Sequence, residues 1–113
     1  MTVKLSSRTE GDVTVVVLEG EINSTTSGGL QAQLLPFVEQ DSRLLIDLSA
    51  VSYVSSAGLR TLLIVHRRAQ QLQTGVILVG LSEEVRFVMS ATGFLDFFET
   101  EDDLDAARER AGR

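Results

Sequence analysis

The residues of this sequence best placed for chemistry are two adjacent serines, Ser55 and Ser56, in the stretch Val54-Ser55-Ser56-Ala57-Gly58. A serine hydroxyl becomes a nucleophile when a histidine is positioned to take its proton. A hydrolase nucleophile elbow has glycine on both sides of the serine, in the pattern G-x-S-x-G, and Val54 stands where the first glycine belongs. The single histidine, His66, is expected to be a packed or partly exposed helix residue. We therefore predict no catalytic residue and no enzyme activity, and a serine hydrolase is the enzyme-class alternative.

The sequence also lacks the residues that other common active and binding sites require. The 113 residues include no cysteine, which excludes a disulfide framework and a sulfur-ligated metal, and the phosphate-loop, dinucleotide and H-E-x-x-H patterns are absent. We predict neither metal nor cofactor. The formal charge of −6 has the wrong sign for a nucleic-acid partner. No aliphatic run approaches the ~18 residues of a membrane span, and the N-terminus has no signal-peptide core, so we predict no membrane partner and a cytoplasmic location.

The first elements that could position the two serines are a hairpin and a helix. Val3 to Ser7 alternates polar and apolar residues, a turn follows at Glu10-Gly11-Asp12, and Val13 to Leu18 is a dense β-branched run. We expect a half-exposed edge strand paired with a strand buried on both faces. The polar residues 24–27 then offer N-caps for a helix of about fourteen residues, which Pro36 should kink or end early.

The rest of the chain alternates strand and helix. The predicted elements are a buried strand at 44–48, a loop at 49–55, a long helix from Ala57 closed by Thr74 and Gly75, a strand at 76–79, a helix capped by Ser82 and followed by Gly93, a short possible strand after residue 94, and a charged terminal helix at 102–110. Three aromatic residues, Phe94, Phe97 and Phe98, are expected to pack the terminal helix.

This order predicts an open α/β fold with a mostly parallel sheet, because each helix serves as a crossover between strands. With 43% hydrophobic residues, the chain has material for one core, and we expect residues 1–113 to form a single domain. Loops that follow parallel strands gather at one edge of the sheet. Residues 23–27 and 52–58 are therefore expected to lie near each other.

The stretch from Asp47 to Arg60 resembles the signature of STAS domains, particularly stand-alone anti-sigma factor antagonists, whose motif reads roughly D-S-[SA]-G-L. Gly20-Glu21-Ile22-Asn23 is similar to the family's first loop, G-x-[LI]-D, and the likeness extends over nearly the whole chain. The resemblance implies a STAS-like open mixed sheet of about four to five strands with three to four helices and an N-terminal β-hairpin. It also implies that Ser56 is a phosphoacceptor, with Ser55 as the alternative, although spacing alone indicates that Ser56 caps the helix.

The function implied by this resemblance is bacterial partner switching. The unphosphorylated protein would bind an anti-sigma factor that is also a GHKL-type serine kinase and release its target; phosphorylation of Ser56 would abolish binding, and a PP2C-type phosphatase would reverse it. The partner-binding residues implied are Asn23, Ser24, Thr25, Ser55, Ser56, Ala57, Gly58 and Arg60.

Alternatives remain open at several of these positions. Asn23 is as well explained by the turn into the helix as by partner contact, and Arg60 by a solvated charge. Many members carry aspartate where this chain has Asn23 and Ser55. The alternative function is therefore a STAS domain that senses a small ligand or serves as a scaffold without phosphorylation. The S-S-A-G-L-R form also resembles a bacterial branch whose output is not always a sigma factor.

Overall fold

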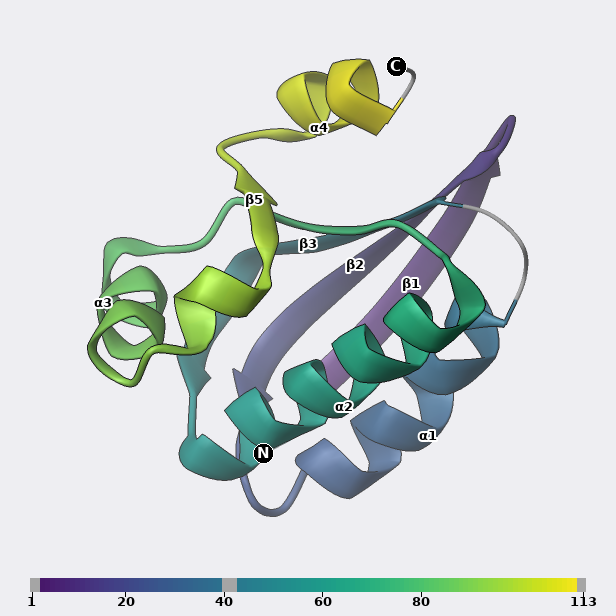
Figure 1. Ribbon diagram of the computed structural model, residues 1–113. Helices are drawn as coiled ribbons and strands as arrows, with labels where there is room; N and C mark the ends of the chain where they lie inside the picture. The colour runs from purple at the N-terminus through teal and green to yellow at the C-terminus, as the bar shows by residue number, and fades with distance from the viewer. Residues whose placement is uncertain (1–2, 40–42, 112–113) are drawn as a thin grey trace.

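The computed structural model describes residues 3–39 and 43–111 and begins with the predicted hairpin (Figure 1). Strand β1 (Val3–Glu10) pairs antiparallel with β2 (Val13–Ile22), from Val3 opposite Gly20 to Glu10 opposite Val13. Gly11 makes the turn with φ of +61°, a conformation that costs glycine little. The edge position of β1 and the burial of β2 on both faces are confirmed.

Five strands form one mixed sheet in the order β1-β2-β3-β4-β5, and every pair except the hairpin is parallel. The remaining elements are α1 (Ser27–Val38), β3 (Arg43–Val54), α2 (Ser56–Leu72), β4 (Val76–Val79), α3 (Glu83–Ala91), the 3-10 turn η1 (Phe94–Phe97), β5 (Glu99–Glu101) and α4 (Leu104–Ala111). The predicted α/β class, hairpin and numbers of strands and helices are confirmed within the described residues.

The helices divide between the two faces of the sheet (Figure 1). The larger core lies under α1, α2 and α3, where Val16, Leu44 and Leu78 point from the sheet. The opposite face is covered by α4, whose Ala107 and Ala111 pack on alternate sheet residues such as Val15 and Ile77. Successive strand residues point to opposite faces, so both faces of the central strands are buried.

Strand β3 is longer than predicted. The expected loop at 49–55 is wrong, because the strand continues from Ser49 to Val54 and pairs with Glu19 to Ile22 through two register shifts. The polar residues between the buried Val51 and Val54 hide this extension in the sequence. Backbone pairing with the far end of β2, which a local pattern does not contain, extends the strand.

Of two further expectations, the early end of the first helix is confirmed and the packing of the phenylalanines is not. Helix α1 ends at Val38, two residues after Pro36, as expected for a proline that cannot donate a backbone hydrogen bond. The predicted packing of the phenylalanines on the terminal helix is wrong. Phe94 and Phe98 pack on the larger core beside α2 and α3, and Phe97 is 55% exposed, because α4 crosses to the other face of the sheet.

Candidate functional site

The loop from β2 into α1 is shaped by Asn23. Its side-chain Oδ1 accepts hydrogen bonds from the backbone N–H groups of Thr25 and Thr26, at 2.9 and 3.1 Å. The Thr26 hydroxyl accepts from the N–H of Asn23 and donates to the carbonyl of Glu21, both at 2.9 Å. Asn23 therefore stabilises the turn, while Ser24 and Thr25 stay exposed beside it.

The loop from β3 into α2 gives the two serines different environments. Ser55 is the N-cap of α2: its Oγ accepts the backbone N–H of Gly58 at 3.2 Å, and the side chain is half-buried. Ser56 is the first helical residue, and its side chain is exposed. The structure therefore assigns the cap, which spacing had placed at Ser56, to Ser55.

The two loops meet at the carboxyl ends of β2 and β3, as predicted. The backbone N–H of Ser55 donates to the carbonyl of Ile22 at 2.8 Å. A Cβ atom added at Gly58 would lie 2.7 Å from the same carbonyl oxygen, 2.8 Å from Cγ2 of Ile22 and 2.9 Å from Cγ1 of Val54. The glycine of the motif is thus the residue that lets α2 approach the end of β2.

Helices α1 and α2 enclose an open groove of about 650 Å³ next to these loops. We call it the α1–α2 groove; its lining residues are Ser27, Gly28, Gln31, Ser56, Ala57, Arg60, Thr61 and Ile64. The buried Thr61 hydroxyl donates to the carbonyl of Ser27 at 3.3 Å and joins the two helices. A Cβ at Gly28 would meet no described residue within 4 Å, so the groove is open on the α1 side in this part of the structure.

The predicted site residues divide into two groups in space. Ser56, Ala57 and Arg60 line the groove. The side chains of Asn23 and Ser55 hold the loops, and Gly58 is buried beneath them. Sequence reasoning missed the α1 side of the groove, namely Ser27, Gly28 and Gln31. The signal that could have indicated it is the absence of any charged residue from position 22 to 38.

His66 lies away from Ser56. It is ten residues further along α2, which corresponds to about 15 Å of helix. Its ring packs against Phe98 with centroids 5.0 Å apart, and its buried Nδ1 has no hydrogen-bond partner among the residues that the structure describes. Burial lowers the pKa of His66 below its usual 6.5, partly opposed by the charge of Glu99. This geometry does not provide a base for either serine.

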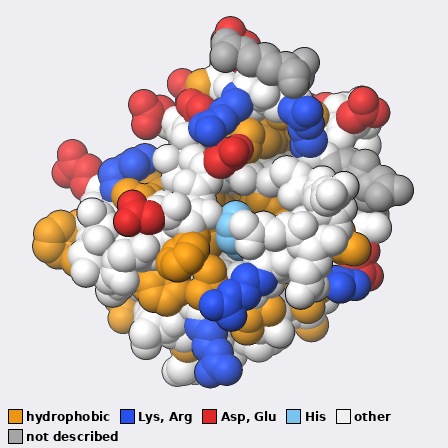
Figure 2. Space-filling model, in the orientation of Figure 1, with side chains coloured by type: hydrophobic (Ala, Val, Ile, Leu, Met, Phe, Trp, Pro, Cys, Tyr) orange, Lys and Arg blue, Asp and Glu red, His pale blue; other side chains and the backbone are white. Residues whose placement is uncertain are grey.

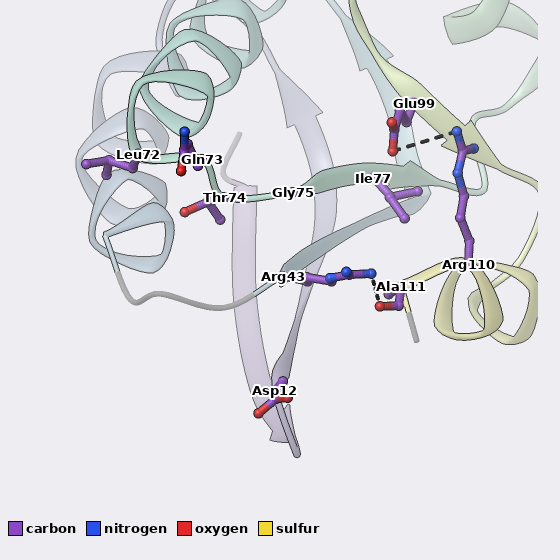
Figure 3. A pocket seen from close by; sticks show the side chains of 10 residues that line it. All are labelled: Asp12, Arg43, Leu72, Gln73, Thr74, Gly75, Ile77, Glu99, Arg110 and Ala111. Carbon is purple, nitrogen blue, oxygen red and sulfur yellow. Dashed lines mark hydrogen bonds and ion pairs between the residues drawn. The ribbon is translucent and has the colours of Figure 1, made fainter. Parts of the chain in front are cut away.

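A larger cavity of about 740 Å³ lies at the opposite end of the sheet, where β3 and β4 begin (Figure 3). Its two arginines contact the protein itself: Arg110 lies 3.7 Å from Glu99, and Arg43 donates to the carbonyl of Ala111. In the described ranges, no group of three or more His, Cys, Asp or Glu side chains could hold a metal ion. Nor is any helix of the same ranges both long and apolar enough to cross a membrane.

The fold and the loop motif together define a STAS domain. A family model described as STAS domain matches residues 4–107, and the chain belongs to this family. It is 35% identical over 94 residues to BtrV of Bordetella bronchiseptica, a candidate anti-sigma factor antagonist, across 82% of this chain and 81% of BtrV.

Solved structures extend the comparison. An anti-sigma factor antagonist from Mycobacterium paratuberculosis has a TM-score of 0.89 and 27% identity, with 98% of this chain and 95% of that chain covered. The Bacillus protein SpoIIAA shares the fold at 18% identity in its unphosphorylated form, with a TM-score of 0.73 over 95% of this chain and 96% of that chain. The chain is therefore a homologue of anti-sigma factor antagonists.

Proposed function

We propose that this protein is a phosphorylation-controlled anti-sigma factor antagonist in a bacterial partner-switching system. The unphosphorylated form binds an anti-sigma factor that is also a GHKL-type serine kinase and thereby releases the target of that kinase. The kinase transfers the γ-phosphoryl group of ATP to Ser56 Oγ, whose proton leaves as ADP is formed, and the phosphoprotein no longer binds. A PP2C-type phosphatase hydrolyses the phosphate. We further propose that residues 1–113 act as one cytoplasmic domain by binding rather than by catalysis.

The exposure of Ser56 carries this proposal. An acceptor hydroxyl must enter the active site of a kinase, and Ser56 is exposed at the first position of α2, on the edge of the α1–α2 groove. Ser55 is a poorer acceptor because its Oγ holds the N–H of Gly58 and its side chain is half-buried. These contacts favour Ser56 over its neighbour.

The physics of the position suits a switch that leaves the fold intact. A phosphate on the first helical residue lies near backbone N–H groups without partners and the positive end of the helix dipole. It adds about −1.5 to −2 charge at pH 7 to a groove whose lining residues include no acid. SpoIIAA matches this chain in both its unphosphorylated and phosphorylated forms, with TM-scores of 0.73 and 0.70, so the shared fold accommodates both states of SpoIIAA.

The test is phosphorylation by the purified cognate kinase followed by peptide mass spectrometry. We expect phosphate on Ser56, none on Ser56→Ala, and retained phosphorylation of Ser55→Ala. Kinase binding should persist with Ser56→Ala and be lost with Ser56→Asp. Equal binding of the alanine and aspartate variants would refute the switch.

The ligand-sensing alternative is favoured by one observation, the cavity of about 740 Å³ at the end of the sheet remote from Ser56 (Figure 3). A metabolite bound there would raise the melting temperature of unphosphorylated protein in a concentration-dependent way. A metabolite library screened by thermal shift, with no phosphorylated form detected in the native cell, would support that function over the switch.

A further inference from the structure

Helices α1 and α2 and the lining of the groove between them contain no acidic side chain. Helix α1 carries no charged residue, and residues 48–82, which include all of α2, contain three arginines and no aspartate or glutamate. All sixteen acidic residues of the chain therefore lie outside these segments. In Figure 2, the Lys and Arg side chains in the lower half, over α2, have few acidic neighbours, whereas those in the upper half and at the left lie among most of the Asp and Glu side chains.

Most arginines of the described residues are paired. Examples are Arg68 with Glu39 at 3.3 Å and Arg110 with Glu101 at 2.9 Å. Arg60 and Arg67 are exposed and have no ion-pair partner within residues 3–39 and 43–111. Arg60 lines the α1–α2 groove together with Ser56. A cation without a local anion, at the edge of an acid-free groove, is suited to receive an anionic group from another molecule.

From this charge pattern we infer that the α1–α2 groove binds an acidic segment of the partner protein, with a carboxylate of that segment on Arg60, and that phosphate on Ser56 occupies Arg60 instead. The inference rests on the proposed function and specifies how it works. Ser56 and Arg60 are four residues apart on α2, so their side chains lie on the same face one turn apart. The phosphate and the partner's carboxylate therefore compete for one guanidinium.

The overall charge argues for an acidic protein rather than a nucleic acid or an anionic membrane. Those polyanions would be attracted to the few arginines of α2 but repelled by the remainder of a molecule with net charge −6. A single acidic segment seated in the groove meets Arg60 and no acidic lining residue, with Arg67 further along α2. The apolar part of such a segment would cover Ile64, which is half-buried in the groove.

The first experiment measures binding of the purified kinase to unphosphorylated variants. Arg60→Gln is expected to weaken binding about tenfold or more, as close charge pairs at interfaces do. The matched control is Arg86→Gln, which removes the same charge from α3, where Arg86 lies 4.0 Å from Asp102; its binding should stay within about twofold of wild type. Raising the salt concentration should weaken the wild type more than Arg60→Gln.

The outcomes separate the inference from the proposed function. If Ser56→Asp loses the kinase while Arg60→Gln binds like wild type, the switch stands and the Arg60 inference is overturned. If wild type does not bind the kinase at all, both are overturned. Binding of wild type to phosphatidylglycerol vesicles or duplex DNA as tightly as to the kinase would overturn the assignment to an acidic protein.

A second experiment needs no partner. Protein with phosphoserine incorporated at position 56 during translation can be titrated by phosphorus NMR. The second phosphate pKa, ordinarily about 6, should be lower with Arg60 present and rise in Arg60→Gln, while Arg86→Gln leaves it unchanged. Equal phosphate pKa values with and without the Arg60 guanidinium would overturn the competition between phosphate and carboxylate.

Discussion

Replacing Gly58 with alanine should destabilise the protein, although alanine is the better helix former. The added Cβ would lie 2.7 Å from the carbonyl oxygen of Ile22, a backbone atom that cannot rotate away. Relieving this contact moves the first turn of α2 away from β2, and such overpacking costs about 1–3 kcal/mol. The same movement stretches the 2.8 Å hydrogen bond from Ser55 N–H to that carbonyl, which adds about 0.5–1.5 kcal/mol. The helix propensity of alanine returns at most about 1 kcal/mol.

The net expectation is a loss of about 1–3 kcal/mol, or about 5–15 °C in melting temperature for a domain of this size. Urea unfolding followed by circular dichroism measures it. The matched control is Gly29→Ala in α1, where an added Cβ would lie more than 4 Å from the atoms of residues 3–39 and 43–111 outside its own stretch of helix. That change should leave stability unaltered or raise it by up to about 1 kcal/mol. If Gly58→Ala were as stable as wild type, or if both variants shifted in the same direction, the close approach would not be what requires glycine.

Three further predictions concern the cap, an ion pair and the histidine. Ser55→Ala should lose about 1 kcal/mol in urea unfolding, because it removes the cap of α2, whereas Ser56→Ala should stay within about 0.5 kcal/mol; equal losses would contradict the assignment of the cap. Hydrogen bonds from Arg108, the larger cause, and from Arg8 lower the pKa of Glu10 from 4.5 to about 2. The ionised Glu10 therefore stabilises the folded state fully above pH 4.5, and this contribution is lost as pH falls to about 2. Urea midpoints of Glu10→Gln should therefore fall less than those of wild type across that window; parallel curves would show that the pair is not linked to folding. Burial lowers the pKa of His66, so the NMR titration of this single histidine should have its midpoint below 6.5, and His66→Leu should remove the loss of stability that wild type shows as pH falls from 6.5; a midpoint above 6.5 would refute this.

The site is predictable from the sequence to the level of its loops. Two polar segments that follow parallel strands had to meet at one edge of the sheet. The hydrogen bond from the backbone N–H of Ser55 to the carbonyl of Ile22 shows that they do. The assignment of the cap to Ser55 rather than Ser56 was beyond sequence spacing, because adjacent serines have equal capping propensity. The backbone around the N-cap, extended at Ser55 with ψ of 176°, decides which hydroxyl turns inward and which stays outside.

Longer-range packing set the limits of prediction. The extension of β3 past Ser49 depends on register shifts against β2, and a local pattern of alternating polar residues does not contain its partner strand. The wrong prediction that Phe94 and Phe98 pack on α4 has a similar origin, because these residues are close to α4 in sequence. That helix follows β5 to the opposite face, where the small Ala107 and Ala111 pack on the sheet.

The sequence by itself determined the order of strands and helices, the hairpin, the loop motif and the absence of acids from residues 48–82, because these depend on residue type and near-neighbour spacing. Only the tertiary structure decided that α1 lies beside α2, that Ser56 and Arg60 share a groove, and that Ser55 is held inside. The physical reason is that these outcomes follow from contacts between segments distant in sequence, such as the packing of Gly58 against Ile22, where an added Cβ would lie 2.7 Å from the carbonyl oxygen.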